Sequence, residues 1–461
     1  MRYCQNCGST VDDDAKFCPN CGSNVEMKKE QPQEIGIYST TLEEDNLYYH
    51  DISYPKKNDK KRKIIAGSII TFVVLASIGI IVPITLLSLY GPLDYRYIGD
   101  LDYSFESSTA EILSLDLETF EGDIEIYADM SQFELITATI QVYGRSDATL
   151  IDATNFKNST VGNKEVVIFH TEGYNSFNTT ARYYNLDIII NPKITSEFII
   201  KTFSGNIKFD FGDASDYSIN EVDMYSFSGD IYAAFGYKTE IIANSFAFET
   251  TSGSINTYVE SNSQINVTEI NYSTFSGDIT ATFREQITIN CDTIIIDSES
   301  GFVTFGLDYY ANVEANHLLY TTFSGDIDLD FGYNANLTIP DIVMDSSSGM
   351  ISIYAEDYLF NGNVSWDIET FSGDIYMDLY PNMSSSVNST LNFDITCSSG
   401  EVKIDYEFND IILGLQISAS TTSGDIAIPN GFDFYQSEGF ENKQIKYIFQ
   451  IVTFSGDIEV L

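Results

Sequence analysis

Basic residues are scarce in this chain and unevenly placed. It contains 23 Lys and Arg against 68 Asp and Glu, which gives a formal net charge of −45. Residues 1–90 are close to neutral, so residues 91–461 carry almost all of the negative charge. Because nucleic acids and anionic membrane surfaces repel such a surface, neither is expected to be a partner of the long C-terminal part.

Long apolar runs are also rare, and the single one is informative. Residues 64–90 contain no charged side chain, and about 20 apolar residues suffice to cross a bilayer. We therefore expect a transmembrane helix over 64–90, bent or ended near Pro83. A cleaved signal peptide is the alternative, but the run is long and 63 residues precede it.

The basic residues that do occur indicate an orientation. Residues 56–63, KKNDKKRK, lie directly before the apolar run, whereas only Arg96 appears between its end and residue 145. The positive-inside rule then predicts a single-pass plasma-membrane protein with a cytoplasmic N-terminus and the acidic part outside. The cluster could also bind anionic lipid head groups, although topology alone explains it. Residues 26–63 are expected to be a cytoplasmic linker that includes this cluster.

Cysteine is scarce as well: there are six, and four of them lie in the first 21 residues. Cys4 and Cys7, then Cys18 and Cys21, form two Cys-x-x-Cys-Gly pairs. Four thiolates at this spacing can close a tetrahedron around Zn²⁺, and a reducing cytoplasm disfavours disulfides. Cys291 and Cys397 lie far apart in the sequence and are expected to be buried free thiols.

The N-terminal segment is similar to the short zinc ribbons that begin many bacterial and archaeal membrane proteins. The similarity covers residues 3–25, within a domain that we place at 1–25, and includes all four cysteines. A ribbon this small folds because the metal binds, so the zinc is expected to be structural. Its net negative charge disfavours nucleic-acid binding.

A repeated motif dominates residues 201–461. Phe-Ser-Gly-Asp-Ile or a close variant recurs, and its first seven intervals are each 24 residues; the motif glycines are Gly205, Gly229, Gly253, Gly277, Gly301, Gly325, Gly349, Gly373, Gly400, Gly424 and Gly456. The second, fourth and sixth residues after glycine are mostly apolar, which predicts a strand with one face inward. The pattern predicts an all-β fold, a parallel β-helix whose coils stack about 4.8 Å apart, with glycine permitting a backbone turn at each corner.

Large and small residues alternate from coil to coil at two positions. Two residues before glycine, Phe alternates with Thr251, Glu299 and Ser347; six residues after it, Phe235, Phe283 and Phe331 alternate with Val259, Leu307 and Ala355. One interpretation is a 24-residue coil in which buried Phe rings fill space left by the small neighbour, and the other is a 48-residue coil. We favour the first.

The motif Asp, at positions such as 230, 278, 326 and 374, has two interpretations. A row of carboxylates could bind Ca²⁺, or each Asp could accept hydrogen bonds from corner amides. The row is interrupted by Ser254, Phe302 and Met350. Turn chemistry is therefore favoured over calcium.

This pattern resembles the bacterial and archaeal family of candidate adhesins, a domain of unknown function with Thr-Ser-Gly-Asp-Ile repeats. The resemblance extends upstream to LDIIINPKITSEFIIKTFSGNI (186–207) and LETFEGDIEIYA (117–128). It implies a surface solenoid, here over 201–461, preceded by a capping β region over 91–200. The Phe alternation departs from the usual family motif.

Catalysis is not expected of such a solenoid. No Lys or Arg, the residues with which β-helical polysaccharide lyases hold acidic sugars, occurs between Glu285 and Val402. His170 and His317 are the only histidines beyond the apolar run, and no nucleophile elbow, metal-binding His pair or phosphate loop is present. Acidic pairs suited to glycoside hydrolysis stay open as an alternative.

The sequence thus indicates a membrane-anchored surface protein whose solenoid contacts an envelope component or a protein partner. A sensor that signals through the zinc ribbon is the alternative. We also expect the Gly456 coil to form the end of the stack. The longer interval between Gly424 and Gly456 is expected to cap this coil, with Lys443 and Lys446 facing the acidic surface of the solenoid.

Overall fold

The computed structural model describes residues 2–3, 10–11, 96–105, 110–131, 134–144, 156–171, 182–381, 388–406, 413–429, 431 and 433–461. The chain divides into two units, residues 1–66 and 67–461. The apolar segment 64–90 and the four N-terminal cysteines lie outside the described residues. Among the residues described, no helix is both long and apolar enough to cross a membrane.

The first unit contains one described strand pair. β1 (Arg2–Tyr3) and β2 (Thr10–Val11) run antiparallel, with Arg2 opposite Val11 and Tyr3 opposite Thr10. The segment that joins them contains Cys4 and Cys7.

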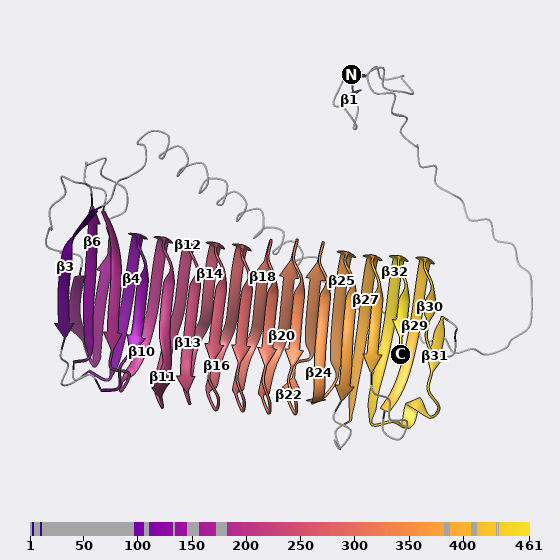
Figure 1. Cartoon of the computed structure of the whole chain (residues 1–461). Helices are drawn as coiled ribbons and strands as arrows, with labels where there is room; N and C mark the ends of the chain where they lie inside the picture. Colours follow the sequence, from indigo (N-terminus) through magenta and orange to yellow (C-terminus); the bar gives the residue numbers. More distant parts are fainter. Residues whose placement is uncertain are drawn as a thin grey trace, which may run out of the picture. The chain divides into compact units, whose positions relative to one another are not determined.

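The second unit is a parallel β-solenoid (Figure 1). One stack of strands ends at the repeat corner and comprises β4 (Ile112–Glu121), β10 (Thr195–Ser204), β12 (Ser218–Ser228), β14 (Glu240–Ser252), β16 (Gln264–Ser276), β18 (Thr288–Ser298), β20 (Asn312–Thr322), β22 (Asn336–Thr338) with β23 (Asp341–Ser346), β25 (Val364–Ser372) and β27 (Ser389–Ser399). The other stack begins after the corner and comprises β5 (Ile124–Ala128), β11 (Ile207–Ser215), β13 (Ile231–Tyr237), β15 (Ile255–Val259), β17 (Ile279–Phe283), β19 (Val303–Leu307), β21 (Ile327–Phe331), β24 (Ile351–Phe360), β26 (Ile375–Pro381) and β28 (Val402–Tyr406).

The register of these stacks confirms the 24-residue coil. Ile255 lies opposite Ile279, Ile279 opposite Val303, and Val303 opposite Ile327. Neighbouring strands of one stack are therefore equivalent strands of consecutive repeats, and the 48-residue alternative is wrong. In all of these pairs the strands run parallel, as expected for a chain that winds in one direction.

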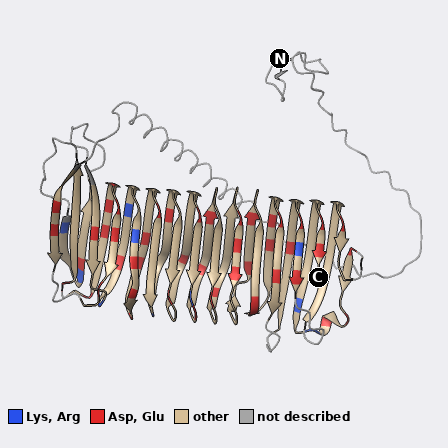
Figure 2. Ribbon diagram, in the orientation of Figure 1, with Lys and Arg blue, Asp and Glu red and all other residues tan. Residues whose placement is uncertain are grey.

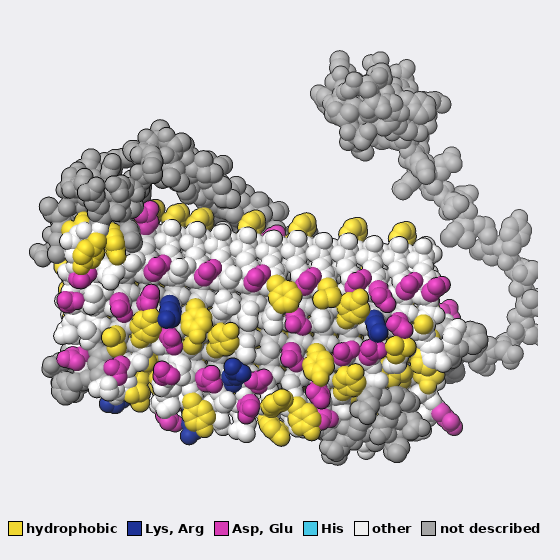
Figure 3. Space-filling model, in the orientation of Figure 1, with side chains coloured by type: hydrophobic (Ala, Val, Ile, Leu, Met, Phe, Trp, Pro, Cys, Tyr) yellow, Lys and Arg dark blue, Asp and Glu magenta, His cyan; other side chains and the backbone are white. Residues whose placement is uncertain are grey.

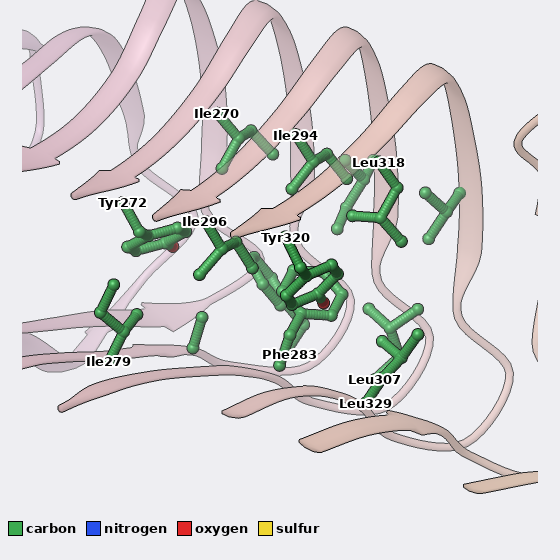
Figure 4. Close-up of a cluster of buried hydrophobic side chains, with 14 of the residues drawn as sticks. Ile270, Tyr272, Ile279, Phe283, Ile294, Ile296, Leu307, Leu318, Tyr320 and Leu329 are labelled. Atoms are coloured by element: carbon green, nitrogen blue, oxygen red, sulfur yellow. The ribbon is translucent and has the colours of Figure 1, made fainter. Parts of the chain in front are cut away.

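The core fills the space between the two stacks. Ile327, Leu329 and Phe331 are fully buried, which confirms the predicted inward face. Figure 4 shows side chains from both stacks, among them Ile294, Tyr320 and Leu307, directed toward one another. The column six residues after glycine lies in this core, where Phe331 is buried and its neighbour in the next coil is the small Ala355. In this column, the predicted alternation of large and small residues therefore lets each ring pack against a small neighbour in the core.

At the N-terminal end, the strands that follow β4 and β5 first extend the stack away from the repeats, and the chain then returns to the other side of β4 and β5 to begin the repeats. β8 (Lys164–His170) and β9 (Arg182–Ile190) pair in parallel with the outer sides of β4 and β5, while β10 and β11 pair with their inner sides. Antiparallel strands complete this end: β6 (Ile136–Gly144), β3 (Arg96–Phe105) and β7 (Phe156–Val161).

At the C-terminal end, the strands are not stacked in sequence order. β32 (Ile445–Ser455) and β33 (Ile458–Val460) lie between β27–β28 and the earlier strands β29 (Leu413–Ser423) and β30 (Ile426–Ala427). The expectation that the Gly456 coil would form the end of the stack is therefore wrong. That coil is enclosed on both sides, and the β29–β30 coil lies at the end.

The segment between Gly424 and Gly456 nevertheless forms a cap. β31 (Phe434–Gln436) pairs antiparallel with the outer edge of β29, and the short helix η1 (Phe440–Asn442) buries Phe440. Capping of the exposed edge is thus confirmed. The lysines were expected to face the acidic wall, but Lys446 contacts Glu441 of the same segment at 3.8 Å and lies over the Phe440 ring.

Candidate binding edge at the repeat corner

The repeat corner is held together by hydrogen bonds between coils. Three residues before most motif glycines, a Ser or Thr donates its hydroxyl to the glycine carbonyl of the preceding coil. The exceptions include Thr322 and Thr370, whose hydroxyls have no hydrogen-bond partner among the described residues, and Cys397, which donates its thiol to the Gly373 carbonyl. Ser226 Oγ lies 2.9 Å from the Gly205 oxygen, and Thr274 Oγ1 lies 3.1 Å from that of Gly253. This inward hydroxyl satisfies a carbonyl that the strand ladder leaves unused at the turn.

The motif glycines form a column in which the backbones nearly touch. A Cβ built on Gly229 would lie 2.1 Å from the Gly205 carbonyl oxygen, and one on Gly325 would lie 1.9 Å from that of Gly301. Gly229 and Gly325 do not have positive φ, so the expected reason for glycine, an unusual turn conformation, is wrong at these corners. Close approach of successive coils excludes any side chain here.

The motif Asp fastens one coil to the next. Asp230, Asp278 and Asp326 each accept a 2.8 Å hydrogen bond at Oδ1 from the amide of Ser254, Phe302 and Met350 respectively. The favoured interpretation, turn chemistry, is therefore confirmed. These three bonds each reach a coil whose own motif position is not Asp, whereas Asp457 accepts the amide of another motif residue, Asp425.

The motif Phe column lies on the outside. Phe323, Phe371 and Phe454 are 64%, 71% and 67% exposed. The prediction that these rings are buried between coils is wrong for this column, because the buried Thr322 next to Phe323 uses the inward position. Figure 3 shows hydrophobic side chains spaced along one long edge of the solenoid.

Where consecutive coils all carry Phe, the rings stack. Phe203 lies between Phe120 and Phe227, with ring centroids 4.8 and 4.6 Å away and planes within 5° and 1° of parallel. From Phe227 onward, every second ring is replaced by a smaller or polar residue, beginning with Thr251. The rings therefore become regularly spaced projections.

The enclosed C-terminal coil preserves this alternation. In sequence order the column would read Phe371, Ser398, Thr422, Phe454. In spatial order Phe454 lies between Ser398 and Thr422, because β32 lies between β27 and β29. Rings thus occupy every second coil to the end of the stack.

The surface around this edge is acidic (Figure 2). Burial, followed by the nearby Asp223 and Glu269, raises the pKa of Glu249, and burial raises the pKa of Asp297. On the other stack, burial and the carboxylates of Asp328, Asp308 and Glu356 raise the pKa of Asp330 to about 6. Carboxylates held this close destabilise one another and favour any arriving cation.

The residues considered for catalysis are not assembled into a site. His170 and His317 lie on separate coils, and each bonds to an Asp at 2.9 Å, Asp116 and Asp341 respectively. A shallow hollow of about 320 Å³ is lined by Cys291, Asp292 and Glu314, among others. Burial raises the pKa of the Cys291 thiol to about 12, which makes it a weak nucleophile.

The remaining sequence predictions concern cysteines and metals. Cys291 is half-buried and Cys397 fully buried, both as free thiols, which confirms that they do not pair. Within the described residues, no group of three or more His, Cys, Asp or Glu side chains is arranged to hold a metal ion. The predicted zinc ligands lie outside those residues, and their chemistry, four thiols in two closely spaced pairs, is that of a structural zinc site.

Together these observations define a parallel β-solenoid whose coils are joined by a glycine corner. Residues 139–461 match the Toastrack DUF4097 family, and the chain belongs to that family. Residues 3–25 match the zinc-ribbon domain family, which confirms the resemblance seen at the N-terminus.

Solved structures of three bacterial proteins are similar to the chain at low identity. A candidate cell adhesion protein from Clostridium sporogenes is 12% identical, with 79% of this chain and 99% of that chain covered and a TM-score of 0.21. Candidate adhesins from Bacteroides fragilis and Parabacteroides distasonis are 12% and 10% identical, with 79% of this chain and 97% and 98% of theirs covered and TM-scores of 0.17 and 0.19. No curated protein matches.

Proposed function

We propose that this chain is a membrane-anchored surface protein whose solenoid edge binds a partner on an envelope or a neighbouring cell. The observation that carries the proposal is the row of exposed motif phenylalanines. A large apolar ring stabilises a fold only when it is buried. Rings exposed repeatedly at one position therefore add little to stability, and a row of them indicates a binding surface. Their fixed spacing on a rigid solenoid suits recognition of a repetitive or extended partner.

The other segments have supporting roles in this proposal. Residues 64–90 form the membrane anchor, with residues 26–63 on the cytoplasmic side and residues 91–461 outside. Cys4, Cys7, Cys18 and Cys21 hold a structural Zn²⁺ that folds the ribbon. Catalysis forms no part of the proposed function.

Adhesion of cells that display the full chain tests this function. Replacing Phe323, Phe371 and Phe454 together with Ser should reduce adhesion strongly while display levels stay unchanged, because these rings are exposed. The matched control replaces Tyr309 and Tyr310, which are exposed away from the corner, with Ser. Equal adhesion of the two variants would contradict the role of this edge.

Protease treatment of intact cells tests the topology. The repeats should be digested while residues 1–60 remain intact, because the Lys/Arg asymmetry places them on opposite sides of the membrane. Protection of the repeats would reverse the proposed orientation.

A further inference from the structure

Two openings in the motif Phe column have the geometry of a binding slot. The first lies between the rings of Phe323 and Phe371, with Ser347 in the intervening coil; the second lies between Phe371 and Phe454, with Ser398 in the intervening coil. We name them the Ser347 slot and the Ser398 slot. Coils are about 4.8 Å apart, so two rings separated by one coil are about 9.6 Å apart.

The chain itself shows what fits such a slot. Phe203 occupies the equivalent place between Phe120 and Phe227, at 4.8 and 4.6 Å from the two rings. Those three coils therefore represent the filled form of the slot. In the Ser347 and Ser398 slots the middle ring is absent, and the space left accepts one planar group in a stack.

The charge around the slots selects a cation. Asp326 and Asp374 flank the Ser347 slot at the corner, and Asp374 and Asp457 flank the Ser398 slot. Each uses Oδ1 to accept a backbone amide of the neighbouring coil. The other oxygen of each remains an acceptor, and that of Asp374 also accepts the Tyr376 hydroxyl at 3.4 Å. No Lys or Arg occurs between Glu285 and Val402 to neutralise Asp326 and Asp374, and Lys403, on the strand next to Asp457, approaches Asp405 and Glu459 instead.

Elsewhere on the solenoid, the chain's own basic residues make the contacts that these slots offer. Lys208 lies over the Tyr127 ring, and Lys238 over the Tyr237 ring. Lys201, two residues before a motif Phe, approaches Asp223 of the next coil at 3.8 Å. The coils of Phe323, Ser347 and Phe371 have the rings and carboxylates without any Lys or Arg.

We infer that the Ser347 and Ser398 slots bind arginine side chains of a partner peptide in the polyproline II conformation, one guanidinium to each slot. A guanidinium is planar, stacks on aromatic faces and pairs with carboxylates, so it meets both features of the slot. This inference rests on the proposed function and names the class of partner.

The spacing of the slots selects the conformation. Polyproline II rises about 3.1 Å per residue with three residues per turn, so every third side chain recurs on one face after about 9.3 Å. That is close to the two-coil spacing of about 9.6 Å. Same-face residues of a β-strand recur after about 6.8 Å, and heptad positions of an α-helix recur after about 10.5 Å. Neither repeat matches the spacing of the slots as closely as polyproline II does.

Binding of synthetic peptides to the full chain in detergent micelles tests this inference. A peptide of Arg-Pro-Pro repeats should bind about tenfold more tightly than a peptide with the same number of arginines in Arg-Thr repeats, and its affinity should fall as salt is added. Equal affinities would overturn the inference. Ala-Pro-Pro repeats control for the proline backbone, and their equal binding would overturn it as well.

Filling the slots tests their role without weakening the fold. Ser347→Phe combined with Ser398→Phe should abolish the preference for Arg-Pro-Pro repeats, because each new ring takes the place that Phe203 takes in the N-terminal coils. Tyr309→Phe, an aromatic exchange away from the corner, is the matched control. Unchanged binding by the filled variant would overturn the inference.

The two proposals fail in different ways. If no peptide binds but adhesion still depends on Phe371, the arginine partner is wrong and the binding edge stands. A second copy of the chain is the alternative occupant. A Phe371-dependent dimer in sedimentation, without peptide binding, would overturn the inference in favour of that occupant.

Discussion

In two columns of the solenoid, Phe alternates with smaller residues in every second coil. One column faces the core and the other faces the solvent. Phe331, six residues after its glycine, is fully buried, whereas Phe323, two residues before the same glycine, is mostly exposed. In the buried column a small neighbour makes room for a ring, and in the exposed column it leaves an opening between rings. Periodicity between coils therefore does not distinguish inside from outside; position within the strand does.

The largest expected effect is the difference in stability between truncating a buried ring and truncating an exposed ring. Phe331→Ala should lower the free energy of unfolding by about 3 to 5 kcal/mol, because it leaves a cavity between the stacks. Phe323→Ala should cost less than about 1 kcal/mol, because its ring is solvated. Denaturant unfolding measures both, and similar losses would remove the distinction between the columns.

Enlarging the small member of each column should produce effects of opposite sign. Ala355→Phe adds a ring to a filled core and should destabilise the solenoid by about 1 to 3 kcal/mol. Ser347→Phe should stabilise it by about 0.5 to 1.5 kcal/mol through stacking on Phe323 and Phe371. Thermal unfolding of the two variants tests this, and a destabilised Ser347→Phe variant would contradict the slot geometry.

A third test concerns the glycine column between the two Phe columns. Gly325→Ala should destabilise by about 1 to 3 kcal/mol, since its Cβ would lie 1.9 Å from the Gly301 oxygen and the coils must separate. Gly306→Ala is the matched control, because no atom lies within 4 Å of its Cβ. Equal stability of both variants would show that the stack yields easily at the corner.

The smallest effect is a pH dependence next to Phe331. Burial and neighbouring carboxylates raise the folded-state pKa of Asp330 to about 6, above the value of an unfolded Asp near 3.9. Lowering the pH from about 6 toward about 4 should therefore add stability, because the folded chain takes up the proton first. Asp330→Asn should reduce this slope in urea unfolding, and the slope that remains comes from other carboxylates whose pKa is raised by burial, such as Glu249 and Asp297. An unchanged slope would contradict the role of Asp330.

The length of the coil and the burial of one of the two Phe columns could be predicted from the sequence. The spacing of glycines gave 24 residues per coil, and alternation after glycine located the buried face correctly. The exposure of Phe323 could have been deduced from Thr322 and Tyr320, which alternate with it and occupy the buried face. The apolar character of a large ring alone predicts burial and does not tell which face of the strand carries it.

Two other features could not be deduced from the sequence. The glycine corner depends on how closely successive coils approach, which a repeat motif does not report. The place of Phe454 depends on a strand pairing that departs from sequence order. One signal existed: the alternation of Phe with smaller residues fails after Ser398 in sequence order and is restored only if Phe454 precedes Thr422 in space.

The placement of β32 and β33 also imposes an order of assembly. Residues 413–427 are synthesised before residues 445–460, yet their strands cannot reach their final neighbours until the later residues have arrived. Earlier coils can form one at a time as the chain lengthens, because each finds its support already in place. The last two coils must therefore form together, because β32 pairs with both β27 and β29. A pause in translation after residue 427 would leave β29 facing the edge of β27, a non-native pairing that later residues would have to displace.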